Sequence, residues 1–157
     1  MKPVEAVETF LQPVRKTVTV ERSIEATFEI FTARISSWWP TDRFSISAER
    51  VRDVLFEGRV GGLLFEVRDD GERFPWGQVL VWDPPSRVAF TWYPGRAADT
   101  AQEVEVRFSA TDKGTLVELE HRGWEALGER AEATRDSYVG GWDAVFGGCF
   151  LRACLEE

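Results

Sequence analysis

Turn-forming sequences recur at short intervals through the middle of the chain, and they limit its fold more than any other feature. Most combine glycine or proline with a charged residue, as turns require. The turns lie at residues 57–59, 69–71, 83–86, 94–95 and 112–114. They delimit segments near 47–56, 60–67, 73–82, 86–93, 101–110 and 114–121. Because a parallel strand pair needs a long crossover, these short returns predict antiparallel neighbours.

Alternation within these segments indicates a sheet with one covered face. Segment 101–110 alternates apolar and charged residues. Segment 114–121 alternates in the same way and places Val117, Leu119 and His121 on its apolar face. An antiparallel sheet with one face on the core and one face in water gives this pattern.

One strand and two short helices are predicted before these segments. Residues 14–20 alternate and are rich in β-branched side chains, which favours a strand. Ser23 is a suitable N-cap for a helix over 24–32. A second short helix is predicted to end at Trp39, because Pro40 disfavours helical geometry in the residue before it.

A long helix is predicted at the end of the chain. It begins somewhere in 125–136, ends near Leu155, and would cover the apolar face of the sheet. The order of elements predicts an α+β fold in which a curved seven-stranded antiparallel sheet wraps around this helix. We expect residues 1–157 to form a single domain with a loosely ordered arm at 1–12.

Four glycines lie inside this C-terminal helix. Each glycine in a helix interior costs roughly 1 kcal/mol relative to alanine, so close contacts are expected to offset the loss. Gly140, Gly141, Ala144, Gly147 and Gly148 share one side of the helix and form a stripe with almost no side-chain volume. The sheet, a ligand or a second subunit could approach along this glycine stripe. The three alternatives stay open, and a homodimer is among the predicted partners.

Charge and composition exclude several classes of function. The formal net charge is −8 and the 19 basic residues are scattered, which argues against nucleic-acid binding. No apolar run approaches the roughly 18–20 residues that span a bilayer, and no signal segment is seen, so we expect a cytoplasmic protein without membrane insertion. One histidine and no Cys-x-x-Cys motif leave almost no ligand set for zinc or iron, and no cofactor is expected. Cys149 and Cys154 lie on different sides of the helix and are expected to stay unbonded.

Large aromatic residues are the unusual part of the composition, with seven tryptophans and eleven phenylalanines. Most buried tryptophans belong to an ordinary core, and each buried indole N–H needs a partner. Several rings around one cavity would instead form apolar walls with a few fixed donors, as in a small-molecule site. Trp38 and Trp39 are the predicted lip of such a site, because a helix end followed by Pro40 and a loop can move as a gate.

The order of elements also resembles the START-like (SRPBCC) helix-grip superfamily. The sequence motifs of the chain are similar to those of the family named for its likeness to the C-terminal domain of the activator of the Hsp90 ATPase. The matching pieces are WWP (38–40), EGRVGG (57–62), DG (70–71), WGQVLVWDPPSRVAFTW (76–92), GTLVELEHRGW (114–124) and YVGGW (138–142). They cover roughly residues 14 to 155, and their order and number carry the resemblance.

The resemblance implies a cavity between the inner face of the sheet and the last helix. Members of the superfamily hold apolar or amphipathic small molecules there, so the preferred function is binding of such a molecule rather than catalysis. The residues expected to contact the ligand are Trp38, Trp39, Phe65, Trp76, Trp92, His121, Tyr138, Trp142 and Phe146.

Two other functions stay open at this point. One is an enzyme of cyclase or hydrolase type with His121 as acid or base, for which Glu66 or Glu103 would be the carboxylate partner if its strand face were reversed. Against it, the chain has no phosphate-binding loop, nucleophile elbow, zinc-protease motif or dinucleotide fingerprint. The other is a protein-interaction module like the chaperone activator, which would use the outer face of the sheet.

Overall fold

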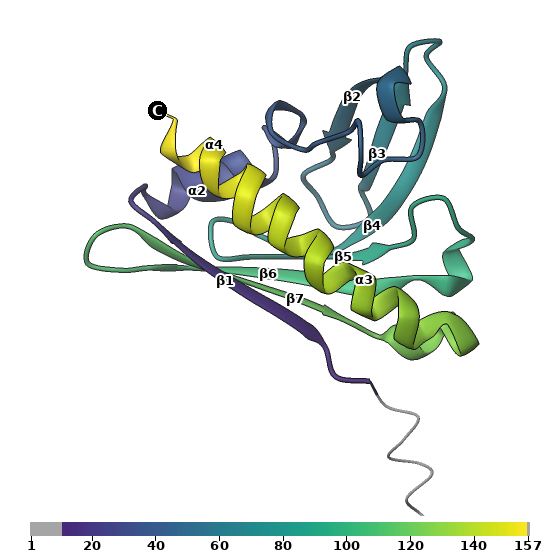
Figure 1. Cartoon of the computed structure of the whole chain (residues 1–157). Helices are drawn as coiled ribbons and strands as arrows, with labels where there is room; N and C mark the ends of the chain where they lie inside the picture. The colour runs from purple at the N-terminus through teal and green to yellow at the C-terminus, as the bar shows by residue number, and fades with distance from the viewer. Residues whose placement is uncertain (1–10, 157) are drawn as a thin grey trace, which may run out of the picture.

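The structure, a computed structural model, describes residues 11–156 and consists of an antiparallel sheet that wraps around a long C-terminal helix (Figure 1). The strands are β1 (Val14–Val20), β2 (Val51–Phe56), β3 (Leu63–Arg68), β4 (Arg73–Asp83), β5 (Arg87–Trp92), β6 (Gln102–Ala110) and β7 (Thr115–Arg122). The α-helices are α2 (Ile24–Phe31), α3 (Ala131–Ala144) and α4 (Leu151–Leu155). Short 3-10 helices are η1 (Ile35–Ser37), η2 (Ala48–Arg50), η3 (Ala98–Thr100) and η4 (Trp124–Arg130), and η5 (Val145–Phe150) is π-helical.

The predicted α+β helix-grip fold is confirmed. All seven predicted strands are present, and three short helices, α2, η1 and η2, lie between β1 and β2, where two were predicted. Ser23 caps α2 as predicted, since its Oγ accepts a hydrogen bond of 3.1 Å from the backbone N–H of Ala26. The predicted arm at 1–12 lies mostly outside the described residues.

The sheet order is β1-β7-β6-β5-β4-β3-β2, and every neighbouring pair is antiparallel. The predicted strands 101–110 and 114–121 pair directly, with Val104 opposite His121. Both residues are fully buried, so the face that alternation assigned to the core does face inward.

Irregular pairing bends the sheet between β3, β4 and β5. The register shifts once between β3 and β4 and once between β4 and β5, and such bulges bend a strand and increase its twist. Gly77 lies beside the first shift, where a Cβ would collide with the carbonyl oxygen of Thr91. As a result β2, β3 and the part of β4 that pairs with β3 bend away from the rest of the sheet (Figure 1).

The C-terminal helix runs as α3, η5 and α4 across the concave side of the sheet (Figure 1). Its start at Ala131 and its end at Leu155 lie within the predicted bounds. Phe146 and Phe150 point inward and stack on each other with ring centroids 5.5 Å apart. Phe150 also meets Phe31 of α2 at 5.3 Å, so α2 and the C-terminal helix share one aromatic core.

Tryptophan rings fill much of the space between the helix and the sheet. Trp39 is central, with its ring centroid 5.1 Å from that of Trp76, 5.9 Å from Trp92 and 6.0 Å from Trp142. All four are buried, and we call them the tryptophan cluster. Their rings pack against one another between the helix and the sheet.

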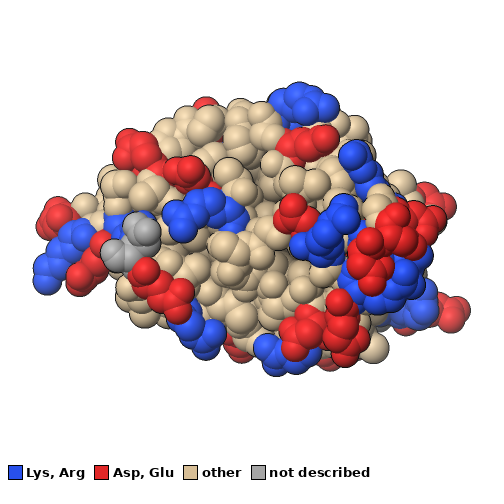
Figure 2. All heavy atoms as spheres, turned by 90° about the horizontal axis from the view of Figure 1, so that it is seen from above, with Lys and Arg blue, Asp and Glu red and all other residues tan. Residues whose placement is uncertain are grey.

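The surface seen from above carries charges of both signs side by side, with no extended basic area (Figure 2). Among the described residues, no helix has the length and apolar character that crossing a membrane would require.

Candidate functional site

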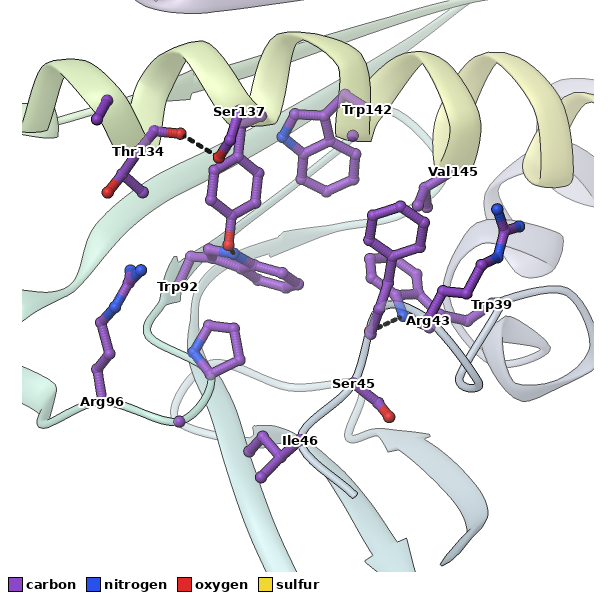
Figure 3. Close-up of a pocket in the computed structure, with 16 residues that line it drawn as sticks. Trp39, Arg43, Ser45, Ile46, Trp92, Arg96, Thr134, Ser137, Trp142 and Val145 are labelled. Atoms are coloured by element: carbon purple, nitrogen blue, oxygen red, sulfur yellow. Dashed lines mark hydrogen bonds between the residues drawn. The ribbon is translucent and has the colours of Figure 1, made fainter. Parts of the chain in front are cut away.

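A partly open cavity of about 630 Å³ lies between α3, the segment after η1 and the loop after β5 (Figure 3). Pockets that hold small molecules usually measure roughly 300–1,000 Å³. Its lining residues are Trp39, Arg43, Phe44, Ser45, Ile46, Trp92, Pro94, Gly95, Arg96, Ala133, Thr134, Ser137, Tyr138, Gly141, Trp142 and Val145. Apolar and aromatic side chains form most of this wall, and two arginines are its only charged residues.

Helix α3 forms one wall because its lining residues recur at helical spacing. Thr134, Tyr138, Gly141 and Val145 follow one another at intervals of four, three and four residues, so they share a face. A Cβ at Gly141 would lie 3.7 Å from the ring of Phe44 across the cavity. The glycine therefore leaves room between α3 and the segment after η1.

The segment after η1 is held in place by a buried carboxylate. Glu66 on β3 is fully buried and accepts hydrogen bonds from the backbone N–H groups of Ile46 and Ser47, both 2.9 Å long. The same carboxylate accepts the indole N–H of Trp76 at 2.8 Å. From the other side, the indole N–H of Trp39 donates to the carbonyl of Phe44 at 2.7 Å. These bonds join the cavity wall to the tryptophan cluster.

Tyr138 places a hydroxyl group on the cavity wall. Its oxygen accepts the indole N–H of Trp92 at 2.9 Å. Burial raises the pKa of Tyr138, while the Trp92 hydrogen bond and the charge of Arg96 oppose this, and the phenol stays protonated at neutral pH. Among the described residues none accepts the hydroxyl hydrogen of Tyr138, which leaves it free to donate to a bound molecule.

His121 lies behind the cavity rather than on its wall. The ring is fully buried; Trp142 donates its indole N–H to Nδ1 at 3.0 Å, and Nε2–H donates to Oε1 of Gln102 at 3.1 Å. Burial, helped by the charge of Arg96, lowers the pKa of His121 from 6.5 to about 3, so the imidazole is neutral. With both nitrogens bonded inside the protein, His121 orients Trp142 and has no free atom for a ligand.

The sequence also matches a family of known proteins. A family model described as Activator of Hsp90 ATPase homolog 1-like protein matches residues 21–155. The chain belongs to this family. Among curated proteins no match was found.

Solved structures similar to this member of the Activator of Hsp90 ATPase homolog 1-like family share its fold over nearly the whole chain. An anthrahydroquino-gamma-pyrone synthase, Txn09, is 33% identical, with 92% of this chain and 97% of the other covered and a TM-score of 0.63. Protein CV1439 from Chromobacterium violaceum is 15% identical, with 94% and 100% covered and a TM-score of 0.67. DynU16, from the dynemicin biosynthetic locus, is 17% identical and has a TM-score of 0.66, and the match covers 93% of this chain and 48% of DynU16.

In this family member, four of the nine residues predicted to contact a ligand line the cavity. They are Trp39, Trp92, Tyr138 and Trp142. The other five, none of which lines it, are Trp38, Phe65, Trp76, His121 and Phe146. Phe65 lies on the face of β3 opposite to Glu66, where Arg73 covers its ring at 5.2 Å, so it points away from the grip. Ligand contact by any of them stays a prediction.

The indole N–H groups are not the fixed donors expected of the site. Trp38 donates to the carbonyl of Ile30 at 2.7 Å, and Trp124 donates to the carbonyl of His121 at 3.0 Å. The four indoles of the tryptophan cluster are bonded inside the protein as described above. Donors to a ligand must therefore come from Tyr138, from hydroxyl groups on the rim, or from the arginines.

One part of the glycine stripe borders the cavity and the other part faces open space. Gly141 borders the cavity, whereas a Cβ at Gly140 or Gly147 would meet nothing within 4 Å. A Cβ at Gly148 would only touch the carbonyl of Asp143 at 3.8 Å. Close packing of the stripe against the sheet, one of the three alternatives, is therefore wrong. A second subunit on the open part stays a prediction.

Three residues that build the site, Glu66, Arg43 and Arg96, are not among the predicted ligand contacts. Glu66 carries a signal, since it is the one carboxylate in the apolar run of β3, but the alternative that pairs it with His121 is wrong. Its partners are instead Trp76 and the backbone at 46–47. The arginines lie in loops without periodicity, where sequence gives no direction for a side chain.

Cysteine and metal chemistry contribute nothing to the described part of the site. Cys149 and Cys154 are both free, as predicted, and burial raises the pKa of Cys154 to about 11. Over residues 11–156, no three His, Cys, Asp or Glu side chains are grouped so that they could hold a metal ion.

Proposed function

We propose that this protein binds a small, aromatic, hydrophobic or amphipathic molecule in the cavity beside α3. The observation that carries the proposal is the cavity itself, about 630 Å³ in volume and floored by the rings of Trp39, Trp92 and Trp142. Aromatic floors favour flat rings through offset or edge-to-face contacts. Hydrogen bonds from these rings to the carbonyl of Phe44, the hydroxyl of Tyr138 and Nδ1 of His121 hold them before any ligand arrives, which reduces the entropy lost on binding.

The similarity to Txn09 supports an aromatic ligand. That relative is named as a synthase of an anthrahydroquino-gamma-pyrone, and its 33% identity spans 92% of this chain. We extend to this chain only the class of compound, a molecule with fused aromatic rings. Such a molecule is rigid and apolar, as the floor of the cavity requires.

Binding can be tested with N-phenyl-1-naphthylamine, a neutral aromatic probe that fluoresces in apolar surroundings. The wild type should bind it with saturable fluorescence and quench part of its own tryptophan emission. Gly141→Leu should abolish the saturable signal, because the new side chain would occupy the space between α3 and Phe44. Gly140→Leu is the matched control, since the neighbouring position is exposed and a Cβ there meets nothing within 4 Å.

The two leucine variants make the result specific to the cavity. Loss of binding in Gly141→Leu with retention in Gly140→Leu, both checked for folding by circular dichroism, supports the proposal. Equal binding by all three proteins, or no binding by the wild type, would contradict it.

A second candidate function is catalysis of ring formation on the bound molecule, favoured by the name of the 33% identical relative. Tyr138 rather than His121 is the group placed to donate a proton, because its hydroxyl lines the cavity and His121 does not. A cell extract incubated with wild-type protein and compared by mass spectrometry with one incubated with Tyr138→Phe tests this function. A product that forms only with the wild type, while both proteins bind the probe, would establish it; identical extracts would remove it.

A further inference from the structure

The charge of the cavity wall is opposite to the charge of the whole molecule. The chain carries 27 acidic and 19 basic residues, yet the residues that line the cavity include two arginines and no aspartate or glutamate. Figure 3 shows Arg43 and Arg96 on opposite sides of the space. A cleft lined by charge of one sign concentrates ligands of the other sign.

Arg96 is the more unusual of the two arginines. Its Nη1 atom is buried and has no hydrogen-bond partner, and no described carboxylate forms an ion pair with its guanidinium. A buried polar group without a partner destabilises a protein, so such groups are uncommon and call for an explanation. The side chain reaches from the loop after β5 toward α3 along the cavity wall (Figure 3). A ligand atom in the cavity would supply the missing acceptor.

A second donor, Tyr138, lines the same cavity as Arg96. The positive charge of Arg96 also acts to lower the pKa of both Tyr138 and His121. The Tyr138 hydroxyl accepts from Trp92 and has its own hydrogen to donate. The neutral imidazole of His121 adds no competing positive charge. The end of the cavity at Arg96 therefore offers one charged donor and one neutral donor to the same acceptor.

On the premise that the proposed function is correct, we infer that the ligand carries an anionic oxygen, as in a carboxylate or an ionised phenol, bound to Arg96 and the Tyr138 hydroxyl. The aromatic body then lies over the rings of Trp92 and Trp142, on the floor of the cavity. Charge-assisted hydrogen bonds of this kind are shorter and stronger than neutral ones, especially away from water.

The test compares two probes of the same shape and different charge, 2-naphthoate and 2-naphthamide. Their dissociation constants are measured by calorimetry for the wild type, Arg96→Gln and Arg43→Gln. The wild type should bind naphthoate roughly ten-fold more tightly than naphthamide, the size expected for one charge-assisted hydrogen bond. Arg96→Gln should remove this preference and leave naphthamide binding within about two-fold.

Arg43→Gln tests the other arginine of the cavity wall, which is exposed and whose guanidinium carbon lies 5.5 Å from the centroid of the Phe44 ring. It should retain most of the preference for naphthoate. Equal affinities of the wild type for the two probes, or loss of the preference in Arg43→Gln rather than Arg96→Gln, would overturn the inference while the proposed function stands. Binding of neither probe and of no phenylnaphthylamine would overturn the proposed function itself.

Discussion

Single buried polar residues hold the aromatic rings of this protein in place. Glu66 accepts three hydrogen bonds and carries no ion pair to a described cation, and His121 bonds through both ring nitrogens. Each links a tryptophan of the cluster to another part of the chain. A ring whose N–H is bonded has one orientation, and that orientation determines where the cavity begins.

The buried histidine should make folding stability depend on pH. Because its pKa is about 3 in the folded protein and near 6.5 when unfolded, only the unfolded chain takes up this proton between those values. Stability is therefore lost as the pH falls, by about 1.4 kcal/mol per pH unit from this group. Between pH 4.5 and 6, the free energy of unfolding in urea should fall more steeply with decreasing pH for the wild type than for His121→Gln. The carboxylates are common to both proteins and do not cause this difference. Equal slopes would contradict the role assigned to burial.

The Glu66 carboxylate should contribute to both stability and binding. Glu66→Gln keeps the shape but replaces one acceptor oxygen by an NH₂ group, leaving a buried N–H unpaired at a cost of about 1–3 kcal/mol. Urea unfolding should show this loss, and phenylnaphthylamine should bind more weakly because residues 46–47 are released from β3. Glu118→Gln, on an exposed position of β7, is the control and should change stability by less than about 0.5 kcal/mol. A similar loss in both variants would remove the special role of Glu66.

At the scale of elements, β4 and the C-terminal helix use glycine in opposite ways. In β4, Gly77 permits a backbone approach that any side chain would prevent. In α3, Gly140 is exposed and its missing side chain makes room for no described atom. The helix is held instead by its inward rings, among them Trp142 and Phe146. Four glycines are tolerated because packing, more than helix propensity, stabilises this helix.

Alanine substitutions at these two glycines should change stability in opposite directions. Gly140→Ala should stabilise the protein by up to about 1 kcal/mol, the difference in helix propensity. Gly77→Ala should destabilise it by several times that amount, about 2–4 kcal/mol, because β4 must move away from Thr91. Thermal unfolding measures both. Destabilisation by Gly140→Ala, with a change in sedimentation behaviour, would show instead that a second subunit packs on the glycine stripe.

Considered as a whole, the molecule separates an apolar interior from a charged outer face of the sheet. On the outer face Glu105 is only 4% exposed because Arg87, Arg107 and Arg122 surround its carboxylate. Burial would raise the pKa of Glu105, but hydrogen bonds from Arg122 and Arg87 outweigh it and lower the pKa. The charges around Glu105 therefore pair with one another, and none is left there for a partner protein. The hypothesis of an interaction module that uses this outer face stays a prediction.

Ligand binding should stabilise the entire fold, since the cavity joins α3, β5 and the segment after η1. A ligand at 100 times its dissociation constant adds about 2.7 kcal/mol to the free energy of unfolding. For a chain of 157 residues this corresponds to a rise in Tm of roughly 5–10 °C. Calorimetry with phenylnaphthylamine should show this rise in the wild type and none in Gly141→Leu. An equal rise in both proteins would place the binding site elsewhere.

The strands, their antiparallel pairing and the covered face of the sheet can all be predicted from the amino-acid sequence. These follow from local rules: turn residues end a strand, period-two alternation defines its faces, and Ser23 starts a helix. The position of His121 inside the sheet followed from the same alternation and is confirmed by its full burial. The ligand-binding cavity of the grip was expected from the resemblance to a family, and the aromatic count was consistent with it.

The size of the cavity and the residues that line it depend on contacts between segments far apart in the chain. Trp39 and Trp76 are both buried and both predicted to contact a ligand, yet Trp39 lines the cavity and Trp76 does not, and their indoles bond to different partners. Arg96 comes from the loop after β5, and the cavity that it lines has its other wall on α3, which begins 35 residues further along the chain. Contacts between distant segments leave no periodic pattern in the sequence. The sequence therefore does not show which rings pack together or which buried groups share a hydrogen bond.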